Sequence, residues 1–191
     1  MSKTKNILIV GVGGQGSILA SNILSMGLIE AGFDVKMAEI HGMSQRGGSV
    51  SSQVRYGEKV FSPIIIKGEA DIIVAFELME ALRWLEYLKP DGKIIVNDYK
   101  IPPISITSKG IEYPKNIMKE LESKVEVYLI DGYKYANKLG NAKVMNIIML
   151  GALLKFLDLE EIDFNEIIES AVKEKFIDVN IEALNYGKSL I

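Results

Sequence analysis

Residues 6–16 have the sequence NILIVGVGGQG, in which a run of apolar residues leads into four glycines. Branched apolar residues that stop at glycine predict a buried β-strand followed by a tight turn. Residues 17–31 then carry apolar side chains at helical spacing, which predicts an α-helix after the turn. Residues 34–40 predict a second strand, so the chain opens with a strand–helix–strand unit. Its two strands should be parallel and joined by a right-handed crossover.

The alternation of strands and helices is interrupted once and then resumes. Residues 41–48 are polar and contain three glycines, which predicts a loop where a second crossover helix would otherwise stand. Residues 49–56 and 59–66 predict a hairpin or a pair of edge strands around a turn at 57–58. The later elements that the sequence predicts are strands at 71–76, 93–97 and 125–130, a turn at 90–92, and helices at 77–88, 114–123, 143–156 and after the capping box Asp163–Glu166.

These elements together predict one α/β domain over residues 1–191. The expected architecture is a three-layer α/β/α fold, with a mixed, mostly parallel sheet between two layers of helices. We expect residues 1–142 to form the α/β core and residues 143–191 to form a C-terminal helical section packed on it. The segment 143–156 is apolar almost all round, so that helix should be buried.

The composition excludes several kinds of chemistry. The 191 residues include no cysteine, which rules out a disulfide scaffold, a thiolate zinc site, a cysteine nucleophile and a cysteine-ligated iron–sulfur cluster on this chain. The single histidine, His41, rules out a histidine-rich metal site, and its spacing implies no catalytic partner. The sequence therefore assigns no catalytic residue and no metal ligand. Any redox chemistry would have its electron relay on another chain.

The patterns of charge and hydropathy narrow the partners and the location. A net charge of −3 with scattered lysines does not provide the basic face that nucleic acid needs. The longest strongly apolar run, near 144–154, is shorter than the roughly 20 residues that cross a membrane. The apolar stretch after Lys5 is too short for a signal peptide and ends in glycines rather than in a cleavage pattern. We expect a cytoplasmic protein that binds neither nucleic acid nor a membrane.

The turn at 11–16 matches the pattern G-x-G-x-x-G in the required place, after a strand and at the start of a helix. Glycines let backbone N–H groups approach a phosphate, and the helix N-terminus adds partial positive charge. Glu39, near the end of the second strand, stands where a dinucleotide-binding fold places its ribose-binding acid. Three interpretations stay open: an NAD or FAD site, a site for another anionic group, or glycines that only permit close strand–helix packing. The candidate binding residues here are Gly11, Gly13, Gly14, Gln15, Gly16 and Glu39.

The loop HGMSQRGGS at 41–49 is the second candidate site. Because it leaves the carboxyl end of the second strand, it should face the same crevice as the turn at 11–16. A guanidinium can clamp a phosphate or carboxylate, and hydroxyl, amide and backbone groups beside it can complete an anion site. Ligand binding, a subunit interface and an internal pairing of Arg46 with Glu39 all stay open, and a loop in place of a helix weakens the dinucleotide interpretation. The candidates here are Ser44, Gln45, Arg46, Gly47 and Gly48.

The two loops together resemble those of the gamma domain of the 2-oxoacid:ferredoxin oxidoreductases, and the second loop is much more specific than a glycine turn alone. The resemblance extends over nearly the whole chain, and it is greatest to the small subunit of the members that act on indolepyruvate. It is also carried by Ser62–Pro63, Gly68–Asp71, Phe76–Glu77, Glu80–Arg83, Asn146, Met149–Ala152, Asn180 and Glu182–Ala183.

This resemblance implies a function within an assembly. Enzymes of the family decarboxylate a 2-oxoacid oxidatively, form an acyl-CoA from coenzyme A and reduce ferredoxin. Thiamine diphosphate, Mg²⁺ and 4Fe-4S clusters would then belong to a cysteine-rich, thiamine-binding alpha subunit, and ferredoxin would be reached through the complex. The present chain would hold none of these groups alone and would be inactive in isolation. Its two glycine loops would face the partner and the crevice for coenzyme or substrate.

Two other functions compete with this expectation. One is a stand-alone NAD(P)- or FAD-binding oxidoreductase or a dinucleotide sensor, and the other is a scaffold without a ligand. A rise in melting temperature with NAD or FAD would favour the first. An interface left without its partner also keeps open the pairing of two copies of the isolated chain.

Overall fold

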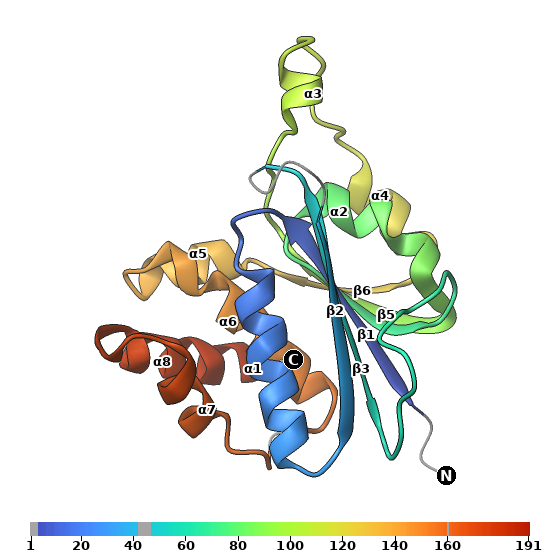
Figure 1. The fold of residues 1–191 in the computed structure, drawn as a ribbon. Helices are drawn as coiled ribbons and strands as arrows, with labels where there is room; N and C mark the ends of the chain where they lie inside the picture. Colours follow the sequence, from blue (N-terminus) through green and yellow to red (C-terminus); the bar gives the residue numbers. More distant parts are fainter. Residues whose placement is uncertain (1–3, 42–46, 160) are drawn as a thin grey trace.

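A computed structural model describes residues 4–41, 47–159 and 161–191 of the chain (Figure 1). Its strands are β1 (Lys5–Val12), β2 (Asp34–His41), β3 (Ser49–Gly57), β4 (Ala70–Ala75), β5 (Leu88–Asn97) and β6 (Glu126–Ile130). Its helices are α1 (Ser17–Glu30), α2 (Leu78–Arg83), α3 (Ile104–Thr107), α4 (Ile117–Glu122), α5 (Gly132–Lys138), α6 (Met145–Phe156), α7 (Phe164–Ala171) and α8 (Ile177–Lys188), with 3₁₀ turns η1 (Leu85–Tyr87), η2 (Ala142–Val144) and η3 (Glu174–Phe176). Among the described residues, we find no helix with the length and apolar character needed to span a bilayer.

The described strands form one sheet in the order β2-β3-β1-β4-β5-β6. The pairs β1–β4, β4–β5 and β5–β6 are parallel, whereas β3 is antiparallel to both of its neighbours, β1 and β2. The sheet is therefore mixed and mostly parallel, as the sequence predicts.

Helices cover both faces of this sheet, and side chains that alternate along each strand form two separate cores (Figure 1). In β1, Ile7 and Ile9 point into a core shared with α1, α6, α7 and α8. Leu8 and Val10 point the other way, into a core shared with α2 and α4. This alternation follows from the period of two residues along a strand. The three-layer α/β/α architecture is confirmed.

The position of β3 differs from the prediction. The strands β1 and β2 run in the same direction, as expected, but β3 lies between them and hydrogen-bonds to both. The predicted hairpin between 49–56 and 59–66 is wrong, because the second segment is irregular and forms no strand. Side chains of β3 hold that segment instead: Arg55 donates to two of its carbonyl groups, and Gln53 accepts from the N–H of Ile65 over 2.6 Å.

Four further elements differ from the predictions. The helix expected at 77–88 ends at Arg83 and continues only as the 3₁₀ turn η1. Residues 90–92, which the sequence predicts as a turn, lie inside β5. The pairing of β4 with β5 is irregular there, because Ala70 pairs with Leu88 and Ile72 pairs with Lys93. The helices α3 and α5 are additions, and α5 is capped by the Asp131 side chain, which accepts from the N–H of Lys134. Local capping was the available signal for α5.

The long apolar helix α6 is buried along nearly its whole length, as predicted, and packs closely on α8. Two glycines make this approach possible. A Cβ atom on Gly151 would lie 2.2 Å from the carbonyl oxygen of Leu184, and one on Gly187 would lie 2.1 Å from the carbonyl oxygen of Ile148. The backbones of the two helices therefore touch at a point where no other residue type fits.

We predict that Gly187→Ala destabilises the protein by about 2 kcal/mol or more, because the added methyl group must push the two helix backbones apart. Helix propensity alone predicts the opposite sign, a gain of about 1 kcal/mol. Urea denaturation of the full chain measures the difference. Asn185→Ala, on the exposed side of the same helix, is the control and should change the free energy of unfolding by less than about 0.5 kcal/mol. A Gly187→Ala protein at least as stable as the parent would contradict the prediction.

Candidate functional site

The parallel strands β1, β4 and β5 end at one edge of the sheet, and the segments that follow them build the candidate site. The turn after β1 lies against the residues that precede β3. The N–H of Gly13 donates to the carbonyl oxygen of Gly48 over 2.8 Å, and the N–H of Gly47 donates to the carbonyl oxygen of Gly13 over 3.3 Å. The structure thus brings together predicted site residues from both glycine loops.

Four other predicted site residues are placed differently or are not placed. Ser44, Gln45 and Arg46 lie outside the described residues. Glu39 is exposed on β2, opposite Ser52 of β3, and β3 separates it from β1. A dinucleotide-binding fold instead puts the ribose-binding acid on the strand next to the one that precedes the glycine turn. Glu39 does not occupy that position, because β3 is inserted there.

Gln15 was predicted as a ligand-binding residue, but its side chain bonds within the protein. Its Oε1 accepts from the N–H of Val12 over 2.8 Å, and its Nε2 donates to the carbonyl oxygen of Phe76 over 2.8 Å. Val12 ends β1, and Phe76 follows β4 directly. The amide of Gln15 therefore joins the ends of two neighbouring parallel strands and holds the turn between them.

The glycines of the turn serve two different purposes. A Cβ on Gly11 would lie 2.8 Å from Gln15 Oε1, and one on Gly16 would lie 2.5 Å from the side-chain nitrogen of Asn146. These two glycines therefore allow close packing. Gly14, with φ near 104°, is exposed and has nothing within 4 Å of an added Cβ. Its backbone is open to approach from outside.

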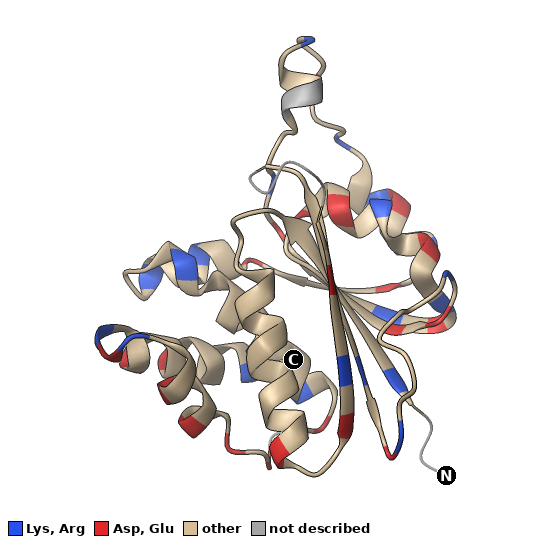
Figure 2. Ribbon diagram, in the orientation of Figure 1, with Lys and Arg blue, Asp and Glu red and all other residues tan. Residues whose placement is uncertain are grey.

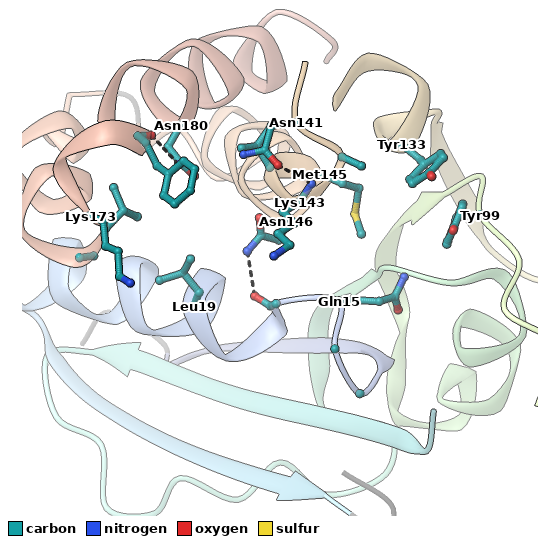
Figure 3. Close-up of a pocket in the computed structure, with 18 of the residues that line it drawn as sticks. Gln15, Leu19, Tyr99, Tyr133, Asn141, Lys143, Met145, Asn146, Lys173 and Asn180 are labelled. Carbon is teal, nitrogen blue, oxygen red and sulfur yellow. Dashed lines mark hydrogen bonds between the residues drawn. The ribbon is translucent and has the colours of Figure 1, made fainter. Parts of the chain in front are cut away.

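A pocket of about 770 Å³ opens beside this turn (Figure 3). Its walls come from the turn and the start of α1, the segment after β5, the start of α5, η2 with the start of α6, and the segment that joins α7 to α8. Asn146 donates from Nδ2 to the carbonyl oxygen of Gly16 over 3.1 Å and so fastens α6 to the start of α1. The pocket is thus assembled from segments that are distant in the sequence.

The pocket carries positive charge. Among the described residues, Lys143 and Lys173 line it and no aspartate or glutamate does, and neither lysine forms an ion pair with another of these residues. At one end, the rings of Tyr99 and Tyr133 stack with centroids 4.4 Å apart. The start of α1 adds the partial positive charge of a helix N-terminus, because Gly16 provides no side-chain cap. Sequence reasoning missed these four side chains, since no motif connects them.

A buried carboxylate on α2 holds the chain directly after the second glycine loop. Glu80 is only 3% exposed, and its carboxylate accepts from the hydroxyl of Ser49, the first residue of β3. It also accepts from the indole of Trp84 over 3.2 Å and from Arg83 over 3.0 Å. Three donors therefore compensate a charge that would otherwise be costly to bury. Glu80 fixes where the loop rejoins the sheet.

A second buried carboxylate anchors an arm. The chain between β5 and α4 projects from the body, with α3 near its tip, and Ile111 there is 55% exposed (Figure 1). Glu77, 1% exposed, accepts from the N–H of Ile101 over 3.1 Å and from the hydroxyl of Tyr113 over 2.5 Å. These donors stand on the outgoing and returning sides of the arm. Burial, and then the hydrogen bond to Glu77, raise the pKa of Tyr113 above its usual value.

Comparison with known families gives a match over nearly the whole chain. The family model for pyruvate ferredoxin/flavodoxin oxidoreductase matches residues 6–190. The indolepyruvate oxidoreductase subunit IorB of Thermococcus kodakarensis is 39% identical over 193 residues, covering 97% of this chain and 95% of that protein. The pyruvate/ketoisovalerate oxidoreductases common subunit gamma of Pyrococcus abyssi is 31% identical over 172 residues, covering 87% and 83%.

Solved structures share the fold. The gamma subunit of a keto/oxoacid ferredoxin oxidoreductase from Geobacter sulfurreducens superposes with a TM-score of 0.73 at 21% identity, over 97% of each chain. The 2-oxoglutarate:ferredoxin oxidoreductase of Magnetococcus marinus, solved with 2-oxoglutarate, coenzyme A and succinyl-CoA, superposes with a TM-score of 0.78 at 21% identity. That match covers 100% of this chain and 31% of the longer one. The same arrangement of strands and helices therefore occurs both as a separate subunit and within a larger polypeptide.

We predict that Gln15→Ala lowers the free energy of unfolding by about 1–3 kcal/mol, because Val12 N–H and the Phe76 carbonyl both lose a partner. Urea denaturation provides the measurement, with Lys134→Gln on the surface of α5 as a control expected to change it little. An unchanged stability for Gln15→Ala would show that the side chain does not hold the turn.

We predict that Tyr113→Phe lowers the free energy of unfolding by about 1–3 kcal/mol at pH 8, because Glu77 loses a donor and the N–H of Met79 loses its acceptor. A tyrosine whose folded pKa is raised stabilises the fold fully below its unfolded pKa, near 10, and loses that contribution as pH rises further. The difference in the free energy of unfolding between parent and variant should therefore become smaller above pH 10. Denaturation at pH 8 and pH 10.5 measures it, and Tyr87→Phe is the control. A gap that widens at high pH would refute the assignment.

Proposed function

The chain belongs to the pyruvate ferredoxin/flavodoxin oxidoreductase family, and we propose that it is the subunit of a 2-oxoacid:ferredoxin oxidoreductase that holds no cluster. The observation that carries this proposal is the 39% identity to an indolepyruvate oxidoreductase subunit over 97% of this chain and 95% of that one. Indolepyruvate is accordingly the favoured 2-oxoacid. The reaction of the complex would convert a 2-oxoacid, coenzyme A and oxidised ferredoxin into acyl-CoA, CO₂ and reduced ferredoxin.

The chemistry of such a reaction would belong to a partner. Thiamine diphosphate with Mg²⁺ supplies the carbanion chemistry of decarboxylation, and 4Fe-4S clusters transfer the electrons. This chain has no cysteine to bind a cluster, and its described residues contain no group of three or more aspartates, glutamates or histidines that fits a metal ion. The composition and the geometry therefore favour a cysteine-rich, thiamine-binding alpha subunit as the partner.

This chain would contribute a wall of the substrate crevice. The contact of Gly13 with Gly47 and Gly48 supports a common orientation of the two glycine loops, at the edge where parallel sheets bind their ligands. The buried carboxylates of Glu80 and Glu77 hold the base of the second loop and the base of the arm. The second loop and the arm can therefore contact a partner without any change in the packing of the core. We place the alpha subunit and the coenzyme at this end of the sheet. We expect the complex to work in the cytoplasm.

Co-expression with the cysteine-rich thiamine-binding chain of the same source tests the proposal. We expect the two chains to purify together as a brown complex that reduces ferredoxin with indolepyruvate and coenzyme A. Each chain alone should be inactive. If the two chains never associate, the proposed function is wrong.

We further predict that Arg46→Glu weakens assembly or turnover at least tenfold, because the reversed charge would repel an acidic partner group or a phosphate. Size-exclusion chromatography and ferredoxin reduction measure the two effects. Lys119→Glu, at an exposed position on α4, is the control and should retain both properties. If Arg46→Glu retains both as well, the loop does not face the partner or the crevice.

A further inference from the structure

We propose that the arm between β5 and α4 is a docking element for the thiamine-binding alpha subunit. Its tip, which carries Ile106 and Ile111, would enter an apolar groove on that subunit. Carboxylates at the rim of the groove would pair with lysines of the arm. This inference rests on the proposed function and deepens it, because it names a surface that recognises the partner and the chemistry that the partner must offer.

The tip of the arm has a defined shape that its own backbone maintains. The helix α3 lies there, and Gly110 follows it in the left-handed conformation, with φ near 64°. The N–H of Ile111 donates to the carbonyl oxygen of Ile106 over 3.0 Å, and the N–H of Gly110 donates to that of Thr107 over 3.2 Å. These two bonds form a Schellman motif, which commonly brings the apolar residue after the glycine beside one in the last turn. The motif therefore groups Ile106 with Ile111.

The rest of the described chain leaves this tip uncovered. Neither of the two cores that the described residues form includes any residue from 102 to 112. Ile111 is 55% exposed, on a segment that projects from the body (Figure 1). Burial of such apolar surface against a partner lowers the free energy of the complex. The tip thus offers contact area that the fold itself does not use.

The base of the arm is fixed before any partner binds. Glu77 accepts from the N–H of Ile101 on the outgoing side and from the hydroxyl of Tyr113 on the returning side. At the start of the arm, the N–H of Leu78 donates to the carbonyl oxygen of Tyr99 over 3.0 Å. A segment that is held on both sides loses less conformational entropy on binding than a free loop does. The arm is therefore suited to docking.

The position of the arm identifies the partner. The arm leaves β5 at its carboxyl end, and Figure 1 shows it projecting beyond the same end of the sheet as the turn at 11–16. The proposed function places the alpha subunit at that end. A subunit that covers the glycine loops would therefore lie within reach of the arm.

Charge gives the second feature of the groove. Residues 100–115 contain three lysines and one glutamate, although the whole chain has a net charge of −3. Lys115 pairs with Glu112 over 2.7 Å, which leaves Lys100 and Lys109, and neither forms an ion pair with a described residue. Figure 2 shows a basic residue, in blue, at the end of the arm. Carboxylates on the partner would complement these two lysines.

Binding of the full chain to the alpha subunit of the same source tests the inference. Ile111→Asp should weaken association about tenfold or more, because a carboxylate would have to enter the apolar groove. Ile66→Asp is the matched control, since Ile66 is 59% exposed on the segment before β4, at the amino end of the parallel strands. It should change association less than about twofold. Titration calorimetry measures the affinity, and urea denaturation confirms that both variants are folded.

Lys109→Glu tests the charge. It should weaken association about threefold or more at low salt, and its difference in affinity from the parent should shrink as salt rises. Lys5→Glu makes the same change of charge at an exposed position at the start of β1 and is the control. A loss of affinity that is the same in both variants would show that only net charge matters, and it would overturn the acidic rim.

Hydrogen exchange provides a measurement that needs no variant. Addition of the alpha subunit should slow amide exchange in residues 101–113 and leave exchange in residues 58–66 unchanged. Equal exchange in residues 101–113 with and without the alpha subunit would overturn the inference.

The outcomes separate this inference from the proposed function. If the parent chains associate, and Ile111→Asp and Lys109→Glu associate as tightly, the subunit function holds and the arm inference is wrong. If the parent chains never associate, the proposed function is wrong and the inference falls with it. If Ile111→Asp only abolishes a pairing of two copies of this chain, measured by sedimentation, the arm binds a second copy and the inference is wrong.

Discussion

The two hydrogen bonds of the Gln15 side-chain amide are the interaction on which the carboxyl end of the parallel strands depends. The amide spans from the end of β1 to the residue after β4, donating to one strand and accepting from the other. A parallel sheet leaves its strand ends without a connecting hairpin, so the backbone groups there need partners from loops. The side chain of Gln15 is the partner of two such groups, and its two hydrogen bonds fix the glycine turn. The pairing of Gly13 with Gly47 and Gly48, and the start of α1, are both built on that fixed turn.

Contacts between the N-terminal and C-terminal halves of the sequence form the pocket. Asn146 holds the carbonyl of Gly16, and the close contact of α6 with α8 sets where the following segment lies. Apolar packing therefore determines the position of a polar pocket. On the other side of the sheet, Glu77 and Glu80 are buried and fully occupied by donors from within the chain. The protein uses its buried carboxylates as anchors for surface segments and leaves its pocket lined by lysines.

Much of this fold follows from local patterns. Branched apolar runs predict the strands, helical spacing predicts α1, a segment that is apolar almost all round predicts the buried α6, and the alternation predicts three layers. The place of β3 does not follow, because periodicity identifies a strand but not its neighbours in the sheet. Gln15 illustrates the same limit at the site: a glutamine among glycines suggests a ligand group, and only the fold shows that Phe76 is its partner. Lys173 and Tyr133 carry no motif, since chemistry assembled from distant segments leaves no spacing to detect.

The bond between Asn146 and Gly16 also sets an order in time, because it joins residues 130 positions apart. Closing a loop of this length costs more conformational entropy than closing the shorter loop between α6 and α8, although the cost rises only slowly with length. During synthesis the turn at 13–16 leaves the ribosome long before its partner Asn146 does. The pocket is complete only after Asn180 has followed. Until then the nascent chain lacks part of the pocket wall, so the pocket is among the last features of the fold to be completed during synthesis.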